Sequence, residues 1–253
     1  MKKRKPIQVG DVFQLNNGGS CTVIQSNSWD DIIIRHNDAH GHVMRVQSSS
    51  LRRGGVRNPY WPSVYGVGFV GVGKHKASEG RVQPREYNLW VAMLQRAYDE
   101  KLHKKHPSYV GVTVCPEWHS FQNFAEWFKS QPNRDLPGVH IDKDLTVIGN
   151  KTYSPDACYL VPAVVNTAVT DCTASRGNLP VGVVFKKRDN RYYAQMNIDG
   201  VMRHLGSYSS PEDAFLVYKE KREERIKIIA EENKSKISEK IYKNLMSWEI
   251  SPF

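Results

Sequence analysis

Apolar residues in the middle of the chain recur first at helical spacing and then at the spacing of strands. From Tyr87 to about residue 100, Trp90, Met93 and Leu94 fall on one side of a helical repeat, which predicts an amphipathic helix. Residues 139–171 change to an apolar run, a polar turn, a second apolar run and a short helical repeat. This stretch is therefore predicted to form a strand–turn–strand–helix unit.

Patterns with a period of two dominate both ends of the chain. Residues 7–57 hold short apolar runs separated by turn residues, which predicts a small N-terminal β-barrel. Residues 181–208 predict three antiparallel strands, followed by a helix that begins at Ser210 with Pro211 in its first turn. The middle strand alternates cleanly, so one face would carry Tyr192, Ala194, Met196 and Ile198, and the other Arg191, Tyr193, Gln195 and Asn197.

Together these elements predict an α+β, multidomain chain. The glycine-rich segment from Gly66 to Gly73 lacks a following Gly-Lys-Ser/Thr, so an extended segment is favoured over a phosphate-binding loop. The predicted parts are a small β-barrel at 1–57, an extended linker at 58–80, a central ββα module at 81–175, a three-stranded antiparallel sheet packed on a helix at 176–232, and a C-terminal helix at 233–253.

The charge of the chain gives information about its binding partner, which the hydrophobic pattern does not. The 253 residues carry a formal net charge of +10, which favours a polyanion because each neutralised phosphate releases counterions. Solubility alone is the alternative explanation of the charge. No apolar run approaches the roughly 18 residues of a membrane span, and the basic Met1–Lys5 is followed by polar residues instead of a signal-peptide core.

Cysteine and histidine positions give little sign of a metal centre. The four cysteines form no CxxC, which favours an intracellular protein with reduced thiols; they are Cys21, Cys115, Cys158 and Cys172. His36, His40 and His42 lie close together, but no acidic or cysteine partner has ligand spacing. A polar hairpin with solvated histidines is the favoured interpretation.

One set of residues suits metal-dependent phosphodiester chemistry, and it lies within the predicted ββα unit. Asp142 follows the first apolar run, Tyr153-Ser154-Pro155-Asp156 forms the turn into the second, and Asn166 lies in the helix. In order and residue type this stretch resembles the phage HNH homing-endonuclease family. Upstream matches to the family are Trp90, Met93, Leu94, Tyr109, Gly111, Val114, Cys115, Trp118, Phe121 and Phe124.

The resemblance implies a chemistry for each matched position. Asp142 and Asn166 would bind Mg²⁺ or Mn²⁺, which prefer hard oxygen donors and would be required only if the nuclease is active. Lys143 stands where the family has its general-base histidine, and Ala157 where it has the asparagine that orients that base. His140 shares a strand face with Asp142, so His140 or Lys143 is the catalytic candidate.

The C-terminal segment resembles a second family, the Apetala/ethylene-response-factor DNA-binding domain. The matching residues are Gly182-Val183, Tyr193-Ala194, Gly200, His204-Leu205-Gly206, Tyr208, Pro211-Glu212-Asp213-Ala214 and Tyr218. In that family the sheet lies in the major groove of duplex DNA. The resemblance and the strand alternation together predict DNA contacts from Lys186, Arg188, Arg191, Tyr193, Gln195 and Arg203.

Two functions remain open from the sequence. One is a phage-type HNH endonuclease relative that binds double-stranded DNA at a specific sequence and nicks it with a divalent metal. The other is a nuclease-dead, sequence-specific DNA-binding regulator, favoured by the replacements at Lys143 and Ala157. Both predict an intracellular, DNA-associated, phage-encoded protein without a membrane or small-molecule partner, and neither predicts whether it is a monomer or a dimer.

Overall fold

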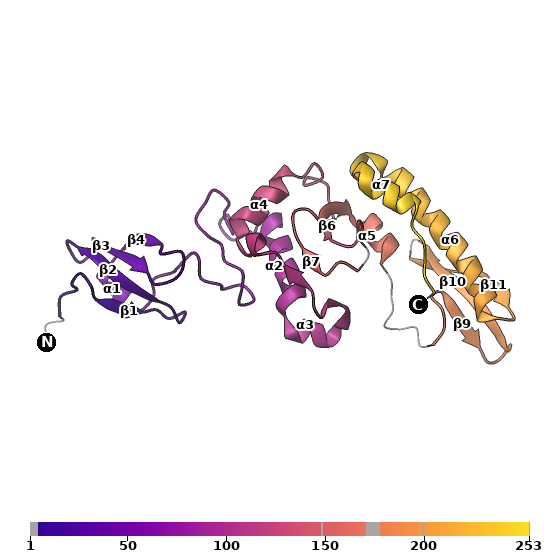
Figure 1. Cartoon of the computed structure of the whole chain (residues 1–253), viewed down its shortest axis with the longest axis horizontal. Helices are drawn as coiled ribbons and strands as arrows, with labels where there is room; N and C mark the ends of the chain where they lie inside the picture. The colour runs from indigo at the N-terminus through magenta and orange to yellow at the C-terminus, as the bar shows by residue number, and fades with distance from the viewer. Residues whose placement is uncertain (1–4, 148, 171–177, 199, 253) are drawn as a thin grey trace. The chain divides into compact units, whose positions relative to one another are not determined.

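The computed structural model describes residues 5–147, 149–170, 178–198 and 200–252 (Figure 1). The chain divides into two compact units, Met1–Lys129 and Ser130–Phe253. Both mix helices with small sheets, so the predicted α+β class is confirmed. Of the predicted features, the end of the short helix at Asp171 and the cysteine Cys172 lie outside the described residues.

The first unit begins with a four-stranded antiparallel sheet. Its strands lie in the order β1-β2-β3-β4 and are followed by a short helix, with bounds β1 Val12–Gln14, β2 Ser20–Ser26, β3 Ile32–His36, β4 Val43–Val46 and α1 Ser48–Arg52. One side buries Cys21, Val23, Ile32 and Ile34. The sequence predicted a closed barrel, but in the described residues β4 does not pair with β1. Closure needs tilted and staggered strands, and the two edge strands are only three and four residues long.

One histidine of this region, His36, differs from the prediction of a solvated cluster, whereas His40 is exposed as predicted. His36 is 1% exposed, and both of its ring nitrogens are buried without a hydrogen-bond partner in the described chain. Burial therefore lowers the pKa of His36. His40 stacks on Tyr60, with 4.4 Å between ring centroids. The pattern His36-x-x-x-His40-x-His42 could not reveal this, because the fifth position of β3 turns its side chain into the sheet core.

The rest of the first unit is a small helical body. Its elements are α2 Arg85–Tyr98, α3 Glu100–Lys105, η1 Pro107–Tyr109, β5 Thr113–Val114, η2 Pro116–His119 and α4 Phe121–Ser130. Trp90, Met93 and Leu94 are fully buried, as the helical repeat predicted. The glycine-rich segment lies against these helices: a Cβ at Gly68 would come within 2.4 Å of the Leu94 side chain. Only a residue without a side chain permits that approach.

The second unit combines a ββα element with a larger sheet. Its first elements are β6 Val139–Asp142, β7 Thr152–Tyr153, β8 Tyr159–Pro162 and α5 Ala163–Val169, with β6 and β8 antiparallel. Then come β9 Val183–Lys186, β10 Arg191–Ile198 and β11 Val201–Tyr208, in the spatial order β11-β10-β9. The chain ends with α6 Pro211–Glu232, η4 Lys234–Lys236 and α7 Glu239–Met246. The predicted strand–turn–strand–helix and three-stranded patterns are both present.

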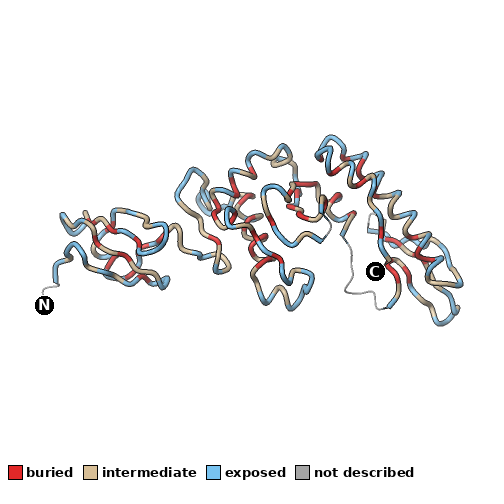
Figure 2. Tube along the Cα trace, viewed as in Figure 1, coloured by how far each residue is buried: buried red, intermediate tan, exposed pale blue. Residues whose placement is uncertain are grey.

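Helix α6 covers one face of the three-stranded sheet (Figure 1). Its start follows the prediction, since Ser210 caps the helix by accepting a hydrogen bond from the Asp213 backbone N–H at 3.1 Å. Ala194 and Met196 are buried under the helix, whereas Arg191 and Asn197 are exposed. Figure 2 shows buried residues both on α6 and on the sheet that it covers. The alternation of β10 is therefore as predicted.

Strand β11 does not alternate regularly against β10. Ala194 pairs with Gly206, but the next residue, Gln195, pairs with His204, so Leu205 is an extra residue in a β-bulge. Gly206 has a φ of 136°, which favours glycine. The bulge shifts the register by one residue, and it thereby decides which side chains of β11 share a face with those of β10.

We predict that Gly182→Ala strongly destabilises the second unit. Gly182 has a φ of 74°, and a Cβ there would lie 2.0 Å from the ring of the buried Tyr218 on α6. The expected loss in the free energy of unfolding is about 3 kcal/mol, measured by urea denaturation.

Gly200→Ala is the matched control. Gly200 has a similar φ of 83°, but nothing lies within 4 Å of its added Cβ. This variant should lose only about 1 kcal/mol, the strain of the backbone alone. Equal losses in the two variants would show that contact with Tyr218 does not matter.

Candidate functional site

The face of the sheet opposite α6 gathers cationic and amide side chains. Residues directly opposite each other on paired strands share a face. Lys186 pairs with Arg191, and Gln195 pairs with His204, so the side chains of all three strands meet on this side. We call this set the open face; it comprises Val184, Lys186, Arg191, Tyr193, Gln195, Asn197, Met202, His204 and Ser207.

Contacts among its neighbours hold part of the open face in place. The Lys186 Nζ lies 4.3 Å from the centroid of the Tyr193 ring. The Tyr193 hydroxyl donates to Asp189 Oδ2 at 2.6 Å, and Arg188 Nε donates to Asp189 Oδ1 at 2.7 Å. The Arg188 and Tyr193 hydrogen bonds lower the pKa of Asp189 to about 2. Asp189 therefore stays ionised and orients both an arginine and a tyrosine at the β9–β10 turn.

Arg191 is anchored by one nitrogen. Its Nη2 donates to the backbone carbonyl of Ser207 at 2.9 Å, across to β11. A guanidinium has five N–H donors, so this bond fixes its direction and leaves further donors for a ligand. Gln195 is half-buried on the same face. Arginine and glutamine side chains held in this way can form paired hydrogen bonds to the edges of bases.

Arg203 and His204 exchange the places that simple alternation gives them. Arg203 is exposed, but it pairs with Met196, which belongs to the face under α6. Its neighbour His204 lies opposite Gln195, with its ring centroid 6.3 Å from that of Tyr193. The structure thus brings Lys186, Arg191, Tyr193 and Gln195 together and leaves Arg203 on the other side. His204 was not predicted to lie on the open face. The feature that places it there is the bulge at Leu205-Gly206.

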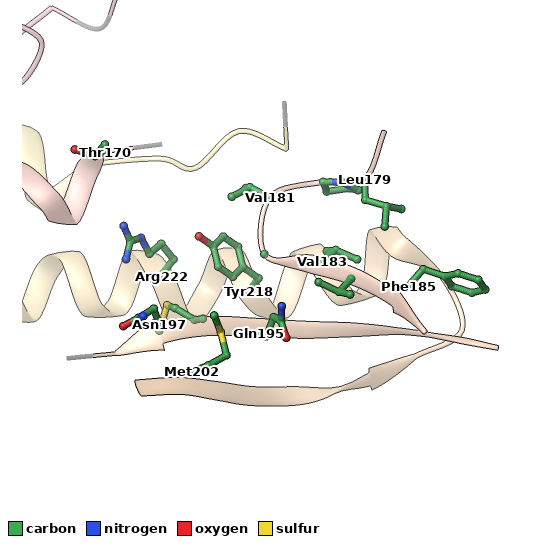
Figure 3. Close-up of a pocket in the computed structure, with 14 residues that line it drawn as sticks. Thr170, Leu179, Val181, Val183, Phe185, Gln195, Asn197, Met202, Tyr218 and Arg222 are labelled. Atoms are coloured by element: carbon green, nitrogen blue, oxygen red, sulfur yellow. The ribbon is translucent and has the colours of Figure 1, made fainter. Parts of the chain in front are cut away.

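A cavity of about 570 Å³ lies beside the edge of the sheet (Figure 3). Gln195, Asn197 and Met202 approach it from the sheet, and Tyr218 and Arg222 from α6. Its position follows from strand length, because β9 pairs with β10 only as far as Ala194. The cavity also reaches Thr170, the last described residue before 178.

The ββα element brings two of the predicted centre residues into contact. Val139 and Ile141 of β6 are buried, so His140 and Asp142 lie on its other face, as the alternation predicted. The Asn166 amide nitrogen on α5 lies 3.2 Å from His140 Nδ1. His140 is exposed. An imidazole and an amide from the two ends of the element therefore meet at the surface.

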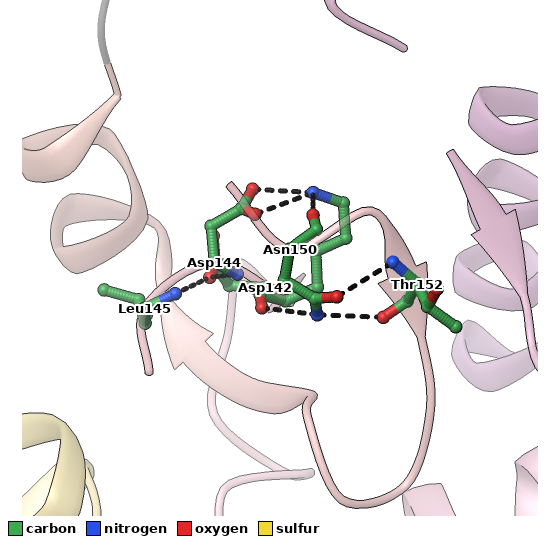
Figure 4. A network of polar contacts seen from close by, with 6 residues as sticks. Asp142, Asp144, Leu145, Asn150 and Thr152 are labelled. Atoms are coloured by element: carbon green, nitrogen blue, oxygen red, sulfur yellow. Dashed lines mark hydrogen bonds and ion pairs between the residues drawn. The ribbon is translucent and has the colours of Figure 1, made fainter. Parts of the chain in front are cut away.

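The Asp142 carboxylate is engaged by the turn that follows it. Its Oδ1 accepts hydrogen bonds from the backbone N–H groups of Asp144 and Leu145, both at 2.8 Å (Figure 4). Burial raises the pKa of Asp142, although these two hydrogen bonds oppose the shift. Asp142 follows His140 by two residues, which places them roughly 7 Å apart along the strand.

Lys143 turns into the loop, away from the face of His140 and Asp142. Its Nζ donates to both carboxylate oxygens of Asp144, at 2.8 and 2.7 Å, and to the Asn150 carbonyl at 2.6 Å (Figure 4). Asn150 in turn donates to the carbonyls of Lys143 and Thr152. An ammonium group has three donors, and all three have partners here. All three ammonium donors of Lys143 are thus engaged within the loop that follows β6.

Ala157 has no side chain that could orient a base. Its backbone N–H donates to the Ser154 carbonyl at 3.3 Å, within the turn that leads to β8. In the family that the sequence resembles, this position holds an asparagine. In this chain the imidazole of the ββα element is that of His140, and the asparagine in contact with it is Asn166.

A divalent cation would find few protein ligands here. Within the described ranges, no three His, Cys, Asp or Glu side chains are grouped so that they could hold a metal. Asp142 and Asn166 still offer a carboxylate and an amide oxygen, and Mg²⁺ binds through one or two carboxylates together with waters and substrate phosphates. In the structure, Asp142 contacts the backbone of Asp144 and Leu145, and Asn166 contacts His140.

Comparison with known proteins gives no relative: the chain matches no family model, no curated protein and no solved structure.

In the part of the chain that the structure describes, no helix is both long and apolar enough to cross a membrane. Cys21, Cys115 and Cys158 form no disulfide within the described part of the chain.

We predict that Asp142→Asn raises stability at neutral pH. Asparagine retains the oxygen that accepts from Asp144 and Leu145, and it removes a charge that burial disfavours. Because the folded-state pKa of Asp142 is raised, the folded chain binds this proton more tightly than the unfolded chain. The carboxylate therefore costs stability above its folded pKa, and the cost vanishes below its ordinary value of 3.8.

Urea denaturation at several pH values checks this prediction. The advantage of Asp142→Asn should be largest near pH 7 and should shrink on acidification. Asp144→Asn is the control, since it leaves the buried Lys143 ammonium without its ion-pair partner and should lower stability at pH 7. If the Asp142→Asn protein is less stable than the parent at pH 7, the conclusion that burial raises the pKa of Asp142 is contradicted.

Proposed function

We propose that this protein binds double-stranded DNA at a specific sequence through the open face and nicks it at the ββα element, as a relative of the phage HNH endonucleases. The observation that carries the proposal is the open face itself. It places two cations, two amides, a tyrosine and a histidine on one rigid surface, while α6 buries the other side. The net charge of +10 suits a polyanion.

Some side chains of the open face would contact bases, and others would contact the phosphates of the DNA. The major groove admits a β-ribbon, and each base pair there presents a distinct pattern of donors and acceptors. Arg191 would bind guanine and Gln195 adenine, with His204 beside Gln195. Lys186 and Arg188, at the β9–β10 turn, would bind phosphates. Tyr193 holds the Lys186 ammonium over its ring, and Arg203 would reach a phosphate from the rim of the sheet.

At the ββα element each side chain has a separate task. Asp142 and Asn166 would hold Mg²⁺ or Mn²⁺, and the bound ion would supply polarisation of the scissile phosphate. His140 would exchange a proton with water or with the leaving oxygen, the role that histidine most often has in acid–base catalysis. Asn166 fixes the ring of His140 through their 3.2 Å contact. One such centre in each chain cuts one strand.

A nuclease-dead DNA-binding regulator is the second candidate. The Lys143 network favours it, because the residue at the family's general-base position is bound on all three donors. Ala157 favours it too, because alanine cannot orient a base. Both candidates use the same open face for DNA, so they differ only in whether the bound duplex is cut.

The first experiment tests DNA recognition. Selection from a pool of random duplexes should enrich one sequence, and Gln195→Ala should bind that sequence about five- to one-hundred-fold more weakly, the value of a paired contact to a base. Gln83→Ala, an exposed glutamine of the other unit, is the matched control and should bind as the parent does. Failure to enrich any sequence at moderate salt would reject both candidates.

The second experiment separates the two candidates. Supercoiled plasmid that carries the enriched sequence is incubated with the protein and Mn²⁺. Nicking by the parent, with none by Asp142→Asn or by His140→Ala, supports the endonuclease, provided that both variants still bind the duplex. Tight binding by the parent with no nicking supports the regulator.

A further inference from the structure

The first unit presents a tryptophan to solvent on the loop between β2 and β3. Trp29 is 67% exposed, and no other aromatic residue is among the strongly exposed apolar residues of the described chain. An indole left in water forgoes the burial that usually makes tryptophan a core or interface residue. Its exposure therefore points to a ligand that covers it.

The loop that carries Trp29 is well ordered by its own hydrogen bonds. Asn27 donates to the Asp31 carbonyl at 3.0 Å and to the Asp31 carboxylate at 2.9 Å. Ser28 donates its hydroxyl to the Asp30 carboxylate. The Trp29 carbonyl accepts from Ser48 N–H at 2.8 Å, which ties the loop to the start of α1. The indole is thus held outward by a fixed backbone.

A cavity of about 330 Å³ lies beside this indole. The charged side chains in its lining are both cationic, Lys5 and Arg52. Hydroxyl groups from Ser26, Ser28 and Ser48 complete the polar part of the lining.

The acidic residues nearby are occupied elsewhere. Asp31 faces Arg45, with 3.2 Å between Oδ1 and Nε, and Asp30 lines a different cavity together with Arg45 and Arg57. The Arg52 guanidinium donates to the backbone carbonyl of Lys5, which ties the N-terminal segment to α1. The cavity beside Trp29 is therefore a small cationic site with an aromatic wall.

We propose that this site binds an unpaired nucleotide of the DNA substrate, with the base stacked on Trp29 and its phosphate paired with Lys5 and Arg52. Stacking on an exposed aromatic beside a cationic path is how single strands are bound without sequence preference. The proposal rests on DNA being the partner, and it adds a second mode of binding. The open face takes the paired duplex, and Trp29 takes a base that has left the stack.

The surroundings of Trp29 favour this ligand over a protein partner. Aromatic anchors of protein interfaces lie in apolar, desolvated pockets. The lining beside Trp29 combines the apolar Pro6, Ile7 and Ile32 with two cations and three hydroxyl groups, and the cations favour a ligand that carries phosphate. An intact duplex also fits poorly, because its bases expose edges in the grooves and keep their faces stacked. A nick or a locally opened site offers a free base beside a phosphate.

The test compares three probes on the full chain by fluorescence anisotropy. They are an oligothymidylate of about 12 nucleotides, an abasic oligonucleotide of the same length, and the duplex enriched for the open face. The parent should bind the oligothymidylate more tightly than the abasic strand. Trp29→Ala should weaken oligothymidylate binding about five- to one-hundred-fold and leave abasic binding unchanged, since only the base stacks.

Three further variants define the contact. Trp29→Phe keeps an aromatic face and should recover most of the oligothymidylate affinity. Lys5→Gln should weaken the oligothymidylate and the abasic strand alike, because both carry phosphates. Val12→Ala truncates another exposed apolar residue of the same sheet, 57% exposed, and should change neither. Unchanged unfolding free energies exclude loss of fold in these surface variants.

Two results overturn the proposal. One is oligothymidylate binding by Trp29→Ala that equals that of the parent, and the other is abasic binding as tight as oligothymidylate binding in the parent. Failure of the proposed function is separate, because it shows in the enriched duplex and in Gln195→Ala. Weaker duplex binding by Trp29→Ala with unchanged oligothymidylate binding would also reject the stacked base.

Discussion

The packing of α6 on one face of the three-stranded sheet is the constraint on which the second unit depends. A sheet of this size is stable only if one face is buried, and here Ala194 and Met196 lie under Ala214 and Phe215 of the helix. Glycine at 182 lets the chain pass against Tyr218 without a gap. Because burial on that side provides the stability, the other side is free to carry polar groups for a ligand.

The same core reaches the ββα element. Val161 of β8 and Val165 of α5 belong to one apolar cluster with Ile226 and Ile229 of α6. The Asn244 amide of α7 also donates to the Leu145 carbonyl at 3.0 Å. The face proposed to read the sequence and the centre proposed to cut it are therefore parts of one unit. The shared core holds the open face and the ββα element at a fixed separation.

Much of this arrangement followed from periodicity. The two faces of β10, the buried side of α2 and the Ser210 cap are local patterns, and the sequence predicted each one. The bulge at Leu205 was missed, because strict alternation places Arg203 on the open face, whereas the register places His204 there. A one-residue shift depends on how two strands pair, which no single strand reveals.

Three other features depended on contacts that the pattern of one strand or turn does not reveal. Lys143 was a candidate base, and the structure shows that it exchanges hydrogen bonds with Asn150, seven residues later, in a loop that the sequence pattern did not predict. His36 looked like part of a solvated hairpin, but the sheet buries it. The N-terminal barrel was inferred from the number of strands. Among the described residues β4 does not pair with β1, so the four strands form a sheet that is not closed.

Photo-crosslinking to the enriched duplex tests the central claim most directly. A crosslinking amino acid is placed either at Gln195, on the open face, or at Leu216, which is 60% exposed on α6. The account predicts a DNA adduct from position 195 and none from position 216. Equal adducts from both positions, or an adduct from 216 alone, would contradict it.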